Sequence, residues 1–288
     1  MEGESKAGWV ELGAIPMGRF GEARLQLHWA IQPVMAFADC GLETRPDDSQ
    51  SNLGWRSDIA SLVSRLRPEG LAAGLSLRDC SLMILDARGA VVDRIPLEGQ
   101  TIDRTVSWLE HRLVARTGDT PASPIRIRDY EMPVHKVAKG GTFDVADRES
   151  FKELAGWFGA GWSALEELAA RETGWAEVRC WPHHFDLGTL KALGSASIGA
   201  GFSPGDDWVP EPYFYVNPYG LEQPPADPPT LAADGHWHTE GWFGAVLPAS
   251  SLLGHPADSR EQAVSSFLRS AVAASMDLIH HPAEPNHR

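Results

Sequence analysis

Four segments of the chain place apolar residues three and four positions apart, the spacing that gives an α-helix one buried face. These segments span about residues 20–39, 102–115, 148–170 and 260–279. Pro33 predicts a kink or an end within the first of them, because proline has no N–H for an interior helical hydrogen bond. Ser259 and Gln262 have the spacing of a capping box, which predicts where the last helix begins.

Shorter apolar segments between these helices are typical of β-strands. They span residues 70–78, 81–86, 90–96, 176–187, 195–202, 213–217 and 241–247. Most of them follow one another without an intervening helix, whereas parallel neighbours would need such a crossover. The order therefore predicts an α+β fold, in which a mainly antiparallel sheet is packed by about four helices in a single unit.

The domain organisation is expected to be simple. We expect one α+β domain over residues 16–280, with flexible ends at residues 1–15 and 281–288. A polar loop at residues 117–124 is the alternative place for an internal division. Residues 218–235 are rich in proline, and structureless segments of this length within a domain are usually lids, binding loops or disordered inserts.

Charge and composition narrow the classes of partner. Acidic residues outnumber basic ones, 39 to 25, for a net charge of −14. Binding to nucleic acid or to an anionic membrane needs clustered Lys and Arg, and the sequence contains no basic run. It also lacks a stretch of about eighteen apolar residues and the pattern of a signal peptide. Three scattered cysteines, Cys40, Cys80 and Cys180, fit a reducing compartment, so we expect a cytoplasmic protein without nucleic-acid or membrane partners.

Histidines and carboxylates gather in two stretches of the second half, RCWPHHFDLG and GHWHTEGW. Alternate residues of a strand lie on one face, about 6.5 Å apart along the backbone. His184 and Asp186 would then share one face, and His236, His238 and Glu240 would share another. If the two strands are neighbours, these side chains converge into an open site for a divalent transition metal such as Zn²⁺.

The roles predicted within this site follow from side-chain chemistry. The predicted metal ligands are His184, Asp186, His236 and His238, with Asp186 serving as a ligand or orienting one. Glu240 is predicted to carry a proton, and His183 is the second candidate catalytic residue. The leading hypothesis is a protein that acts on a small molecule, and its enzymatic form would be a metal-dependent hydrolase.

Three alternatives need no metal. The histidines could be exposed or satisfied polar groups, with the 11 tryptophans filling the core. A non-catalytic binding module would instead line an aromatic pocket with Trp237, Trp242, Tyr213 and Tyr215. An interaction protein would use its acidic surface as the contact face.

Other catalytic systems find no support in the sequence. The glycine-rich phosphate loops, the dinucleotide fingerprint, the serine-hydrolase elbow and the His-Glu-x-x-His metal motif are absent. Cys180 is close to His183 in sequence, but on an uninterrupted strand the two would point to opposite faces. A cysteine nucleophile is therefore not favoured.

A series of longer motifs gives the chain a family resemblance. In order they are ARLQLHWAIQ, PDDSQSNLGW, WPHHFDL, GFSPGD, EPYFYVNPY, GWFGAVLPAS and AVSSFLRSAVAASMDL. This series resembles the bacterial family catalogued as domain of unknown function 5996, over about residues 20–280. The resemblance implies one protein unit and a soluble bacterial protein. It transfers no catalytic residue, because these motifs carry no established chemistry.

Overall fold

The structure is a computed structural model that describes residues 8–121, 123–221 and 223–281. The chain divides into two compact units. Unit 1 comprises residues 1–17, 156–178 and 187–288, and unit 2 comprises residues 18–155 and 179–186. The segment 117–124, the alternative place for an internal division, lies inside unit 2.

The predicted flexible ends fall partly outside the described residues. Residues 1–7 and 282–288 are among those that the structure does not describe. Within the remaining part of the N-terminal segment, Trp9 and Leu12 are buried. The Trp9 ring stacks on Phe214, with ring centroids 6.1 Å apart, so this part of the chain belongs to the core of unit 1.

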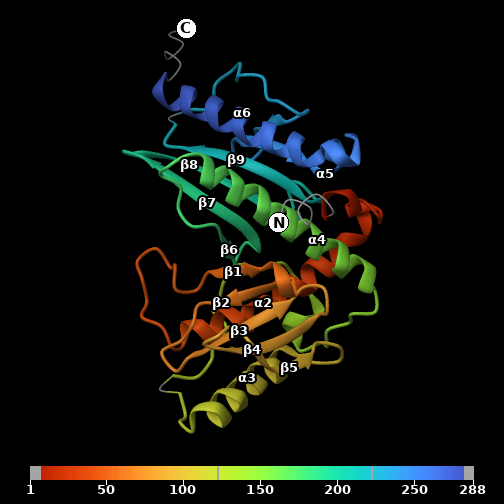
Figure 1. Ribbon diagram of the computed structural model, residues 1–288, viewed down its shortest axis with the longest axis vertical. Helices are drawn as coiled ribbons and strands as arrows, with labels where there is room; N and C mark the ends of the chain where they lie inside the picture. The colour runs from red at the N-terminus through yellow and green to blue at the C-terminus, as the bar shows by residue number, and fades with distance from the viewer. Residues whose placement is uncertain (1–7, 122, 222, 282–288) are drawn as a thin grey trace. The chain divides into compact units, whose positions relative to one another are not determined.

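Unit 2 is built on a sheet with the strand order β6-β1-β2-β3-β4-β5 (Figure 1). Its strands are β1 (Leu53–Arg56), β2 (Ser61–Ser64), β3 (Leu71–Ser76), β4 (Ser81–Asp86), β5 (Val91–Pro96) and β6 (Arg179–Trp181). All the neighbouring pairs are antiparallel. β6 pairs Cys180 with Leu53 of β1, so a late segment of the chain extends a sheet made by an early one.

Helices cover one face of this sheet. They are α2 (Phe20–Asp39) and α3 (Ile102–Thr117). The chain also forms the short 3-10 turns η1 (Met17–Arg19), η2 (Ser57–Ile59) and η3 (Lys136–Lys139). α2 packs on β2 and β3 and is buried over most of its length. The helix continues through Pro33, so the prediction that it could end there is wrong. Burial around Pro33 offsets the one hydrogen bond that the proline cannot donate.

The other face of the unit 2 sheet carries a smaller apolar cluster. Ala72, Met83 and Leu85 are buried there, and Ile59, Val63 and Val91 pack against them while partly exposed. Strand register explains this grouping, because Val63 pairs with Gly74 and Gly74 pairs with Met83. Residues paired across antiparallel strands share a face of the sheet. This outer apolar face is therefore continuous from β2 to β5.

Unit 1 contains a second run of antiparallel strands, in the order β10-β11-β9-β8-β7 (Figure 1). The strands are β7 (Asp186–Leu193), β8 (Ala196–Ser203), β9 (Tyr213–Tyr219), β10 (His236–His238) and β11 (Gly244–Pro248). The helices are α4 (Arg148–Arg171), which begins within unit 2, α5 (Ala249–Leu253), the 3-10 turn η4 (Ala257–Ser259) and α6 (Arg260–His280).

The core of unit 1 lies between its strands and its long helices. α6 contacts β8, β9 and β11. On α4, Trp157 stacks on Phe202 with parallel rings, and Phe158 meets the same ring edge to face. Phe202 in turn contacts Phe214 of β9. These aromatic contacts bury the apolar stripe that predicted α4 from the sequence.

The α+β prediction is confirmed, with antiparallel strands and four long helices close to their predicted bounds. Two predicted strands are wrong in their extent. Residues 176–187 are interrupted by a turn at 182–185 between β6 and β7. The polar segment 236–240 does not run into the core strand, because β10 and β11 are separate strands that pair with each other.

The predicted capping box of the last helix is also wrong. The turn η4 immediately precedes α6 and sets Ser259 in a helical conformation, with φ −106° and ψ −3°. Its hydroxyl donates to the Pro256 carbonyl oxygen instead of accepting from the helix, at 2.9 Å. The Gln262 amide donates to Ser266. A capping box needs extended backbone at the cap residue, which η4 prevents.

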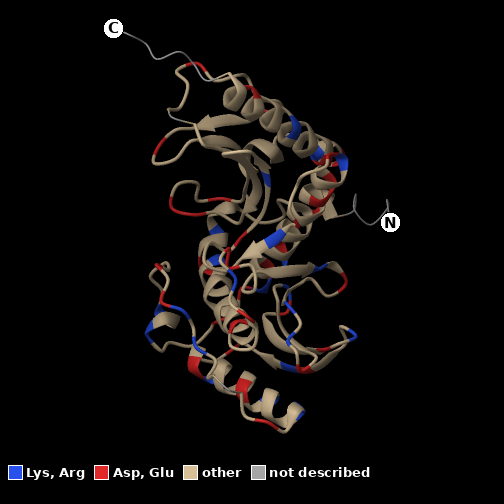
Figure 2. Cartoon of the chain, turned by 90° about the vertical axis from the view of Figure 1, so that its left-hand side faces the viewer, with Lys and Arg blue, Asp and Glu red and all other residues tan. Residues whose placement is uncertain are grey.

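Charged residues of both signs are interspersed along the described chain (Figure 2). In the described residues, no helix combines the length and the apolar character needed to cross a membrane.

Candidate functional site

The four predicted metal ligands are divided between the two units. His184 and Asp186 belong to unit 2, whereas His236 and His238 belong to unit 1. The neighbour of β10 is β11, not the segment that carries His184. Within the described ranges, no group of three or more His, Cys, Asp or Glu side chains is placed to hold a metal ion. The predicted joint metal site therefore finds no support.

The His183–His184 pair lies in a turn and not on a strand. The backbone N–H groups of His184 and Phe185 both donate to the Trp181 carbonyl oxygen, at 3.1 and 2.7 Å. Phe185 has a φ of 58°, which breaks the alternation that the prediction assumed. As a result the two imidazoles lie together, with ring centroids 4.1 Å apart. Burial, followed by the adjacent His184, lowers the pKa of His183 to about 4.

The HWHTE segment is a surface hairpin edge. His238 Nε2 donates to the backbone carbonyl oxygen of Glu240, at 2.7 Å, and its ring packs 4.5 Å from that of Trp242. Burial and the neighbouring His238 lower the pKa of His236. Glu240 is exposed, so the burial that would suit it to carry a proton is missing.

The predicted aromatic residues do not line one pocket together. Register places Tyr215 opposite Val246 and Trp237 opposite Ala245. Since successive residues of β11 face opposite ways, Trp237 and Tyr215 lie on different faces. Trp237 stacks on Phe243 and donates to the Pro229 carbonyl oxygen.

The two tyrosines are held within unit 1 by specific contacts. Tyr213 is buried and its hydroxyl donates to Asp206 at 2.5 Å. Tyr215 covers Gly201 so closely that a Cβ at that glycine would lie 2.1 Å from the ring. This packing accounts for both tyrosines as parts of the sheet.

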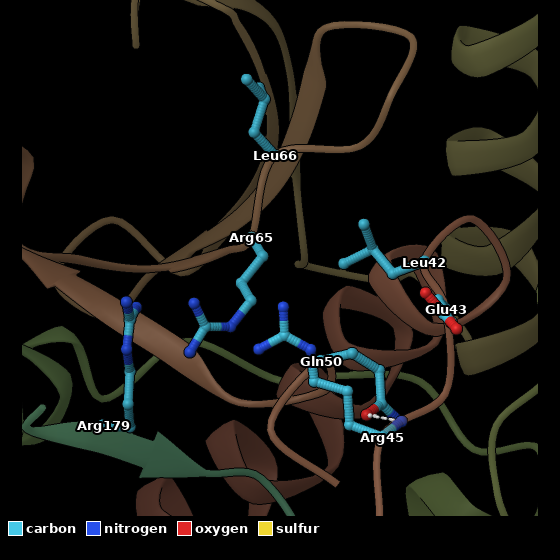
Figure 3. A pocket seen from close by; sticks show the side chains of 7 residues that line it. All are labelled: Leu42, Glu43, Arg45, Gln50, Arg65, Leu66 and Arg179. Carbon is cyan, nitrogen blue, oxygen red and sulfur yellow. Dashed lines mark hydrogen bonds between the residues drawn. The ribbon is translucent and has the colours of Figure 1, made fainter. Parts of the chain in front are cut away.

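A pocket of about 500 Å³ lies in unit 2, where no site was predicted. Its charged and amide lining consists of Arg45, Arg65, Arg179, Glu43 and Gln50. Figure 3 shows the side chains of Arg45, Arg65 and Arg179 around the pocket that all three line. Three positive charges against one negative charge make this a cationic pocket in a protein of net charge −14.

Each arginine of the pocket comes from a different element. Arg45 follows α2, Arg65 follows β2 and Arg179 begins β6. Ser49 contacts two of them, because its carbonyl oxygen accepts from Arg65 Nε at 2.7 Å and its hydroxyl from Arg45 at 3.4 Å. Gly54 makes room for the third, since a Cβ there would lie 2.9 Å from Arg179 Nη1.

Gln50 connects the pocket wall to a charged network beneath it. Its side chain is almost fully buried. The amide oxygen accepts from the backbone N–H of Arg45 at 2.9 Å. The amide nitrogen donates to Asp48 at 2.8 Å and to Asp39 at 3.2 Å. These bonds fix both the amide orientation and the backbone of the loop that carries Arg45.

Arg128 is the centre of this network. It bonds Asp39 through two nitrogens, at 2.6 and 2.5 Å, and it also bonds Asp48 and the Tyr130 hydroxyl. Burial alone would raise the pKa of Asp48, but hydrogen bonds from Arg128, Gln50 and Tyr130 lower it overall. Bidentate guanidinium–carboxylate pairs are the strongest and most directional of such contacts. Arg128 and its partners thus anchor the loop between α2 and β1.

The sequence offered little to reveal this pocket. Asp48 belongs to a polar segment rich in turn-forming residues, a composition typical of a solvated loop, yet it is part of the network. Arg45, Arg65 and Arg179 are isolated basic residues in the sequence, and only the pairing of β6 with β1 brings the third to the first two. A sequence pattern would have to include residues more than a hundred positions apart.

Comparisons of the chain with known proteins do not assign it to a family. The predicted resemblance to a bacterial family therefore stays a prediction. No family model matches the chain, and neither a curated protein nor a solved structure shows a significant match to it.

Proposed function

We propose that unit 2 binds a small anionic molecule in the pocket formed by Arg45, Arg65 and Arg179. The observation that carries the proposal is the convergence of three guanidinium groups on one pocket of about 500 Å³. This volume falls within the usual range for small-molecule sites, about 300–1,000 Å³. A small-molecule partner was also the expectation from the sequence.

The chemistry of the lining selects the charge of the ligand. Guanidinium groups present planar pairs of N–H donors that match carboxylate and phosphate oxygens. The lining contains three guanidinium groups and one carboxylate, that of Glu43. A dianion such as a phosphate monoester or a dicarboxylate is the class of ligand that this lining favours. A cationic ligand is disfavoured by the same count.

The network beneath the pocket favours binding with little rearrangement. Gln50 and Arg128 hold the loop of Arg45 through hydrogen bonds that do not involve a ligand. A site whose groups are already ordered loses less conformational entropy when it binds. The proposal is for a binding module, and it assigns no catalytic step to His183, Glu240 or the other predicted catalytic and metal-ligating residues.

We place this binding in the cytoplasm. Support comes from Cys40, Cys80 and Cys180, all of which are free thiols. Burial raises the pKa of the thiols of Cys80 and Cys180, which keeps both protonated and unreactive. Free, unpaired cysteines are typical of reducing compartments.

Isothermal titration calorimetry with phosphate, methyl phosphate and succinate tests the proposal, with methanol and succinamide as uncharged counterparts. We expect the anions to bind and the uncharged compounds not to bind. Arg45→Gln and Arg179→Gln should each weaken binding about 10- to 100-fold, the effect of losing one charge-assisted hydrogen-bond pair.

The matched control is Arg94→Gln. Arg94 pairs with Asp79 on the surface and does not line the pocket, so its removal should leave the affinity unchanged. Equal affinities for wild type, Arg45→Gln and Arg179→Gln would exclude this pocket as the anion site.

A further inference from the structure

A second, shallower pocket of about 280 Å³ adjoins the cationic one. Both pockets are lined by Leu66 and Arg179, so they are neighbours within unit 2, and the pair of pockets is called the groove. The two parts differ in character. The first part is lined mainly by charged and amide groups, and the second runs over Val63, Ala72 and Leu85.

The floor of the second part is the outer apolar face of the sheet. Ala72 pairs with Leu85, and both belong to the cluster that Val63 joins while partly exposed. Most apolar side chains of this size are buried against helices, whereas these face a pocket. An apolar molecule lying there would bury its own apolar surface and that of the partly exposed Val63, since Ala72 and Leu85 are already almost fully buried.

Leu66 stands where the two parts of the groove meet. Its side chain is 49% exposed, which makes it one of the most exposed large apolar residues of the described chain. It directly follows Arg65, so a charged and an apolar contact come from adjacent positions. A ligand with a charged end and an apolar end would contact both residues at once.

The groove ends beyond the apolar floor. Arg56 Nη1 donates to the Gly89 carbonyl oxygen at 3.2 Å, and both residues line the second pocket. Arg56 is also held by Asp58, at 2.6 and 2.8 Å. This polar end limits the length of any apolar segment that lies in the groove.

From this arrangement we infer that the ligand is amphipathic, namely a phosphate or carboxylate head with a short alkyl or aryl body. This inference rests on the proposed anion site, and it adds the chemical class of the rest of the molecule. The head lies among Arg45, Arg65 and Arg179. The body passes Leu66 and covers Val63, Ala72 and Leu85, ending before Arg56.

A series of alkyl phosphates tests the inference by calorimetry: methyl, butyl, hexyl and octyl phosphate, all below their critical micelle concentrations. Affinity should rise by up to about fourfold for each methylene that reaches the apolar floor. The increase should stop at the chain length that reaches Arg56. A series of the same lengths in which the alkyl chain is replaced by an ethylene glycol chain should show little increase, because the ether oxygens lose hydration when the chain is buried.

Variants locate the effect. Leu66→Ser should reduce the gain from methyl to hexyl phosphate by at least about fivefold and leave methyl phosphate binding unchanged. Leu66→Met should restore the gain. Leu190→Ser is the matched control, because Leu190 is similarly exposed, at 44%, but belongs to unit 1. Thermal melts of each variant confirm that it is folded.

The outcomes separate this inference from the proposed function. If all phosphates bind equally whatever their chain length, the inference is overturned and the anion site stands. If none binds, the proposed function fails as well. Sedimentation tests whether a second copy of the chain occupies the groove instead. If the wild type is a dimer that Leu66→Ser dissociates, and chain length has no effect on phosphate binding, the groove is a dimer interface and the inference is overturned.

Discussion

Gly54 shows how one missing side chain shapes the site. It lies on β1, next to the strand that begins with Arg179, and Arg179 Nη1 lies 2.9 Å from the position that a Cβ would take. Contacts of 2.9 Å with a Cβ are essentially not tolerated, so one of the two groups would have to move. Arg179 is the more flexible of the two.

Gly54→Ala is therefore expected to displace Arg179 and to weaken anion binding about tenfold, while the melting temperature changes little. Calorimetry and a thermal melt measure the two effects. Gly21→Ala is the control, because nothing lies within 4 Å of a Cβ at that position. Unchanged affinity in Gly54→Ala would show that Arg179 contributes no ligand contact.

His28 shows how burial controls a titration. It is 5% exposed, its Nε2 donates to the His183 carbonyl oxygen at 3.1 Å, and its ring stacks on Phe185. Burial, as the largest cause, lowers its pKa from 6.5 to about 4. The unfolded chain therefore takes up a proton on His28 at a higher pH than the folded protein does.

The stability that neutral His28 provides is present above pH 6.5 and is lost as the pH falls toward 4. His28→Gln keeps a donor for the carbonyl oxygen but cannot titrate. As the pH falls from 6.5 to 4, we expect the free energy of unfolding to decrease by up to about 3 kcal/mol less in this variant than in the wild type. Urea unfolding across this pH range measures the difference, with His111→Gln, an exposed position on α3, as the control. Parallel curves for wild type and His28→Gln would refute the prediction.

Among the elements, the loop between α2 and β1 depends most on side-chain contacts. Residues 40–52 contain little regular structure, yet Gln50, Ser51 and Asn52 are buried. Arg128 joins this loop to the end of α2 by bonding both Asp48 and Asp39. The geometry of the cationic pocket thus depends on a residue that does not line it.

Arg128→Gln should destabilise unit 2 by about 2 kcal/mol, because two half-buried carboxylates lose their charged partner. Hydrogen exchange should accelerate in residues 43–52, and anion affinity should fall together with it. Arg116, which pairs with Asp93, is more exposed than Arg128, so Arg116→Gln should cost less than about 1 kcal/mol. An unchanged exchange rate in the loop would mean that Arg128 does not anchor it.

Helices and strands differed in how far the sequence could predict them. The apolar stripe of α4 is a local pattern, and its predicted bounds agree with the structure to within one residue. β1 and β2 have four residues each, and Gly54 and Arg56 obscure the alternation in β1. The turn at 182–185 depends on the positive φ of Phe185, an unusual conformation for a bulky side chain. That turn decided where His183 and His184 lie, so the predicted histidine site failed with it.

At the scale of the whole molecule, the net charge and the pocket have opposite signs. A net charge of −14 repels anions, but at physiological ionic strength salt screens this repulsion beyond about 8 Å. The pocket itself presents three guanidinium groups to one carboxylate. The sequence totals describe an acidic protein, but a sum over the whole chain does not show the local excess of arginine side chains in the pocket.

The position of residues 179–186 in the chain has a consequence for protein synthesis. These residues complete unit 2, because β6 pairs with β1 and the Pro182 carbonyl oxygen accepts from the buried Gln32 side chain at 2.7 Å. Arg179 is the 114th residue that the ribosome adds after Arg65 (179 − 65). At about 5–20 residues per second, that delay is roughly 6 to 23 seconds. During this time β1 is an open edge strand of a nascent chain, so the interval before residue 179 emerges is when unit 2 is most exposed to mispairing and to chaperones.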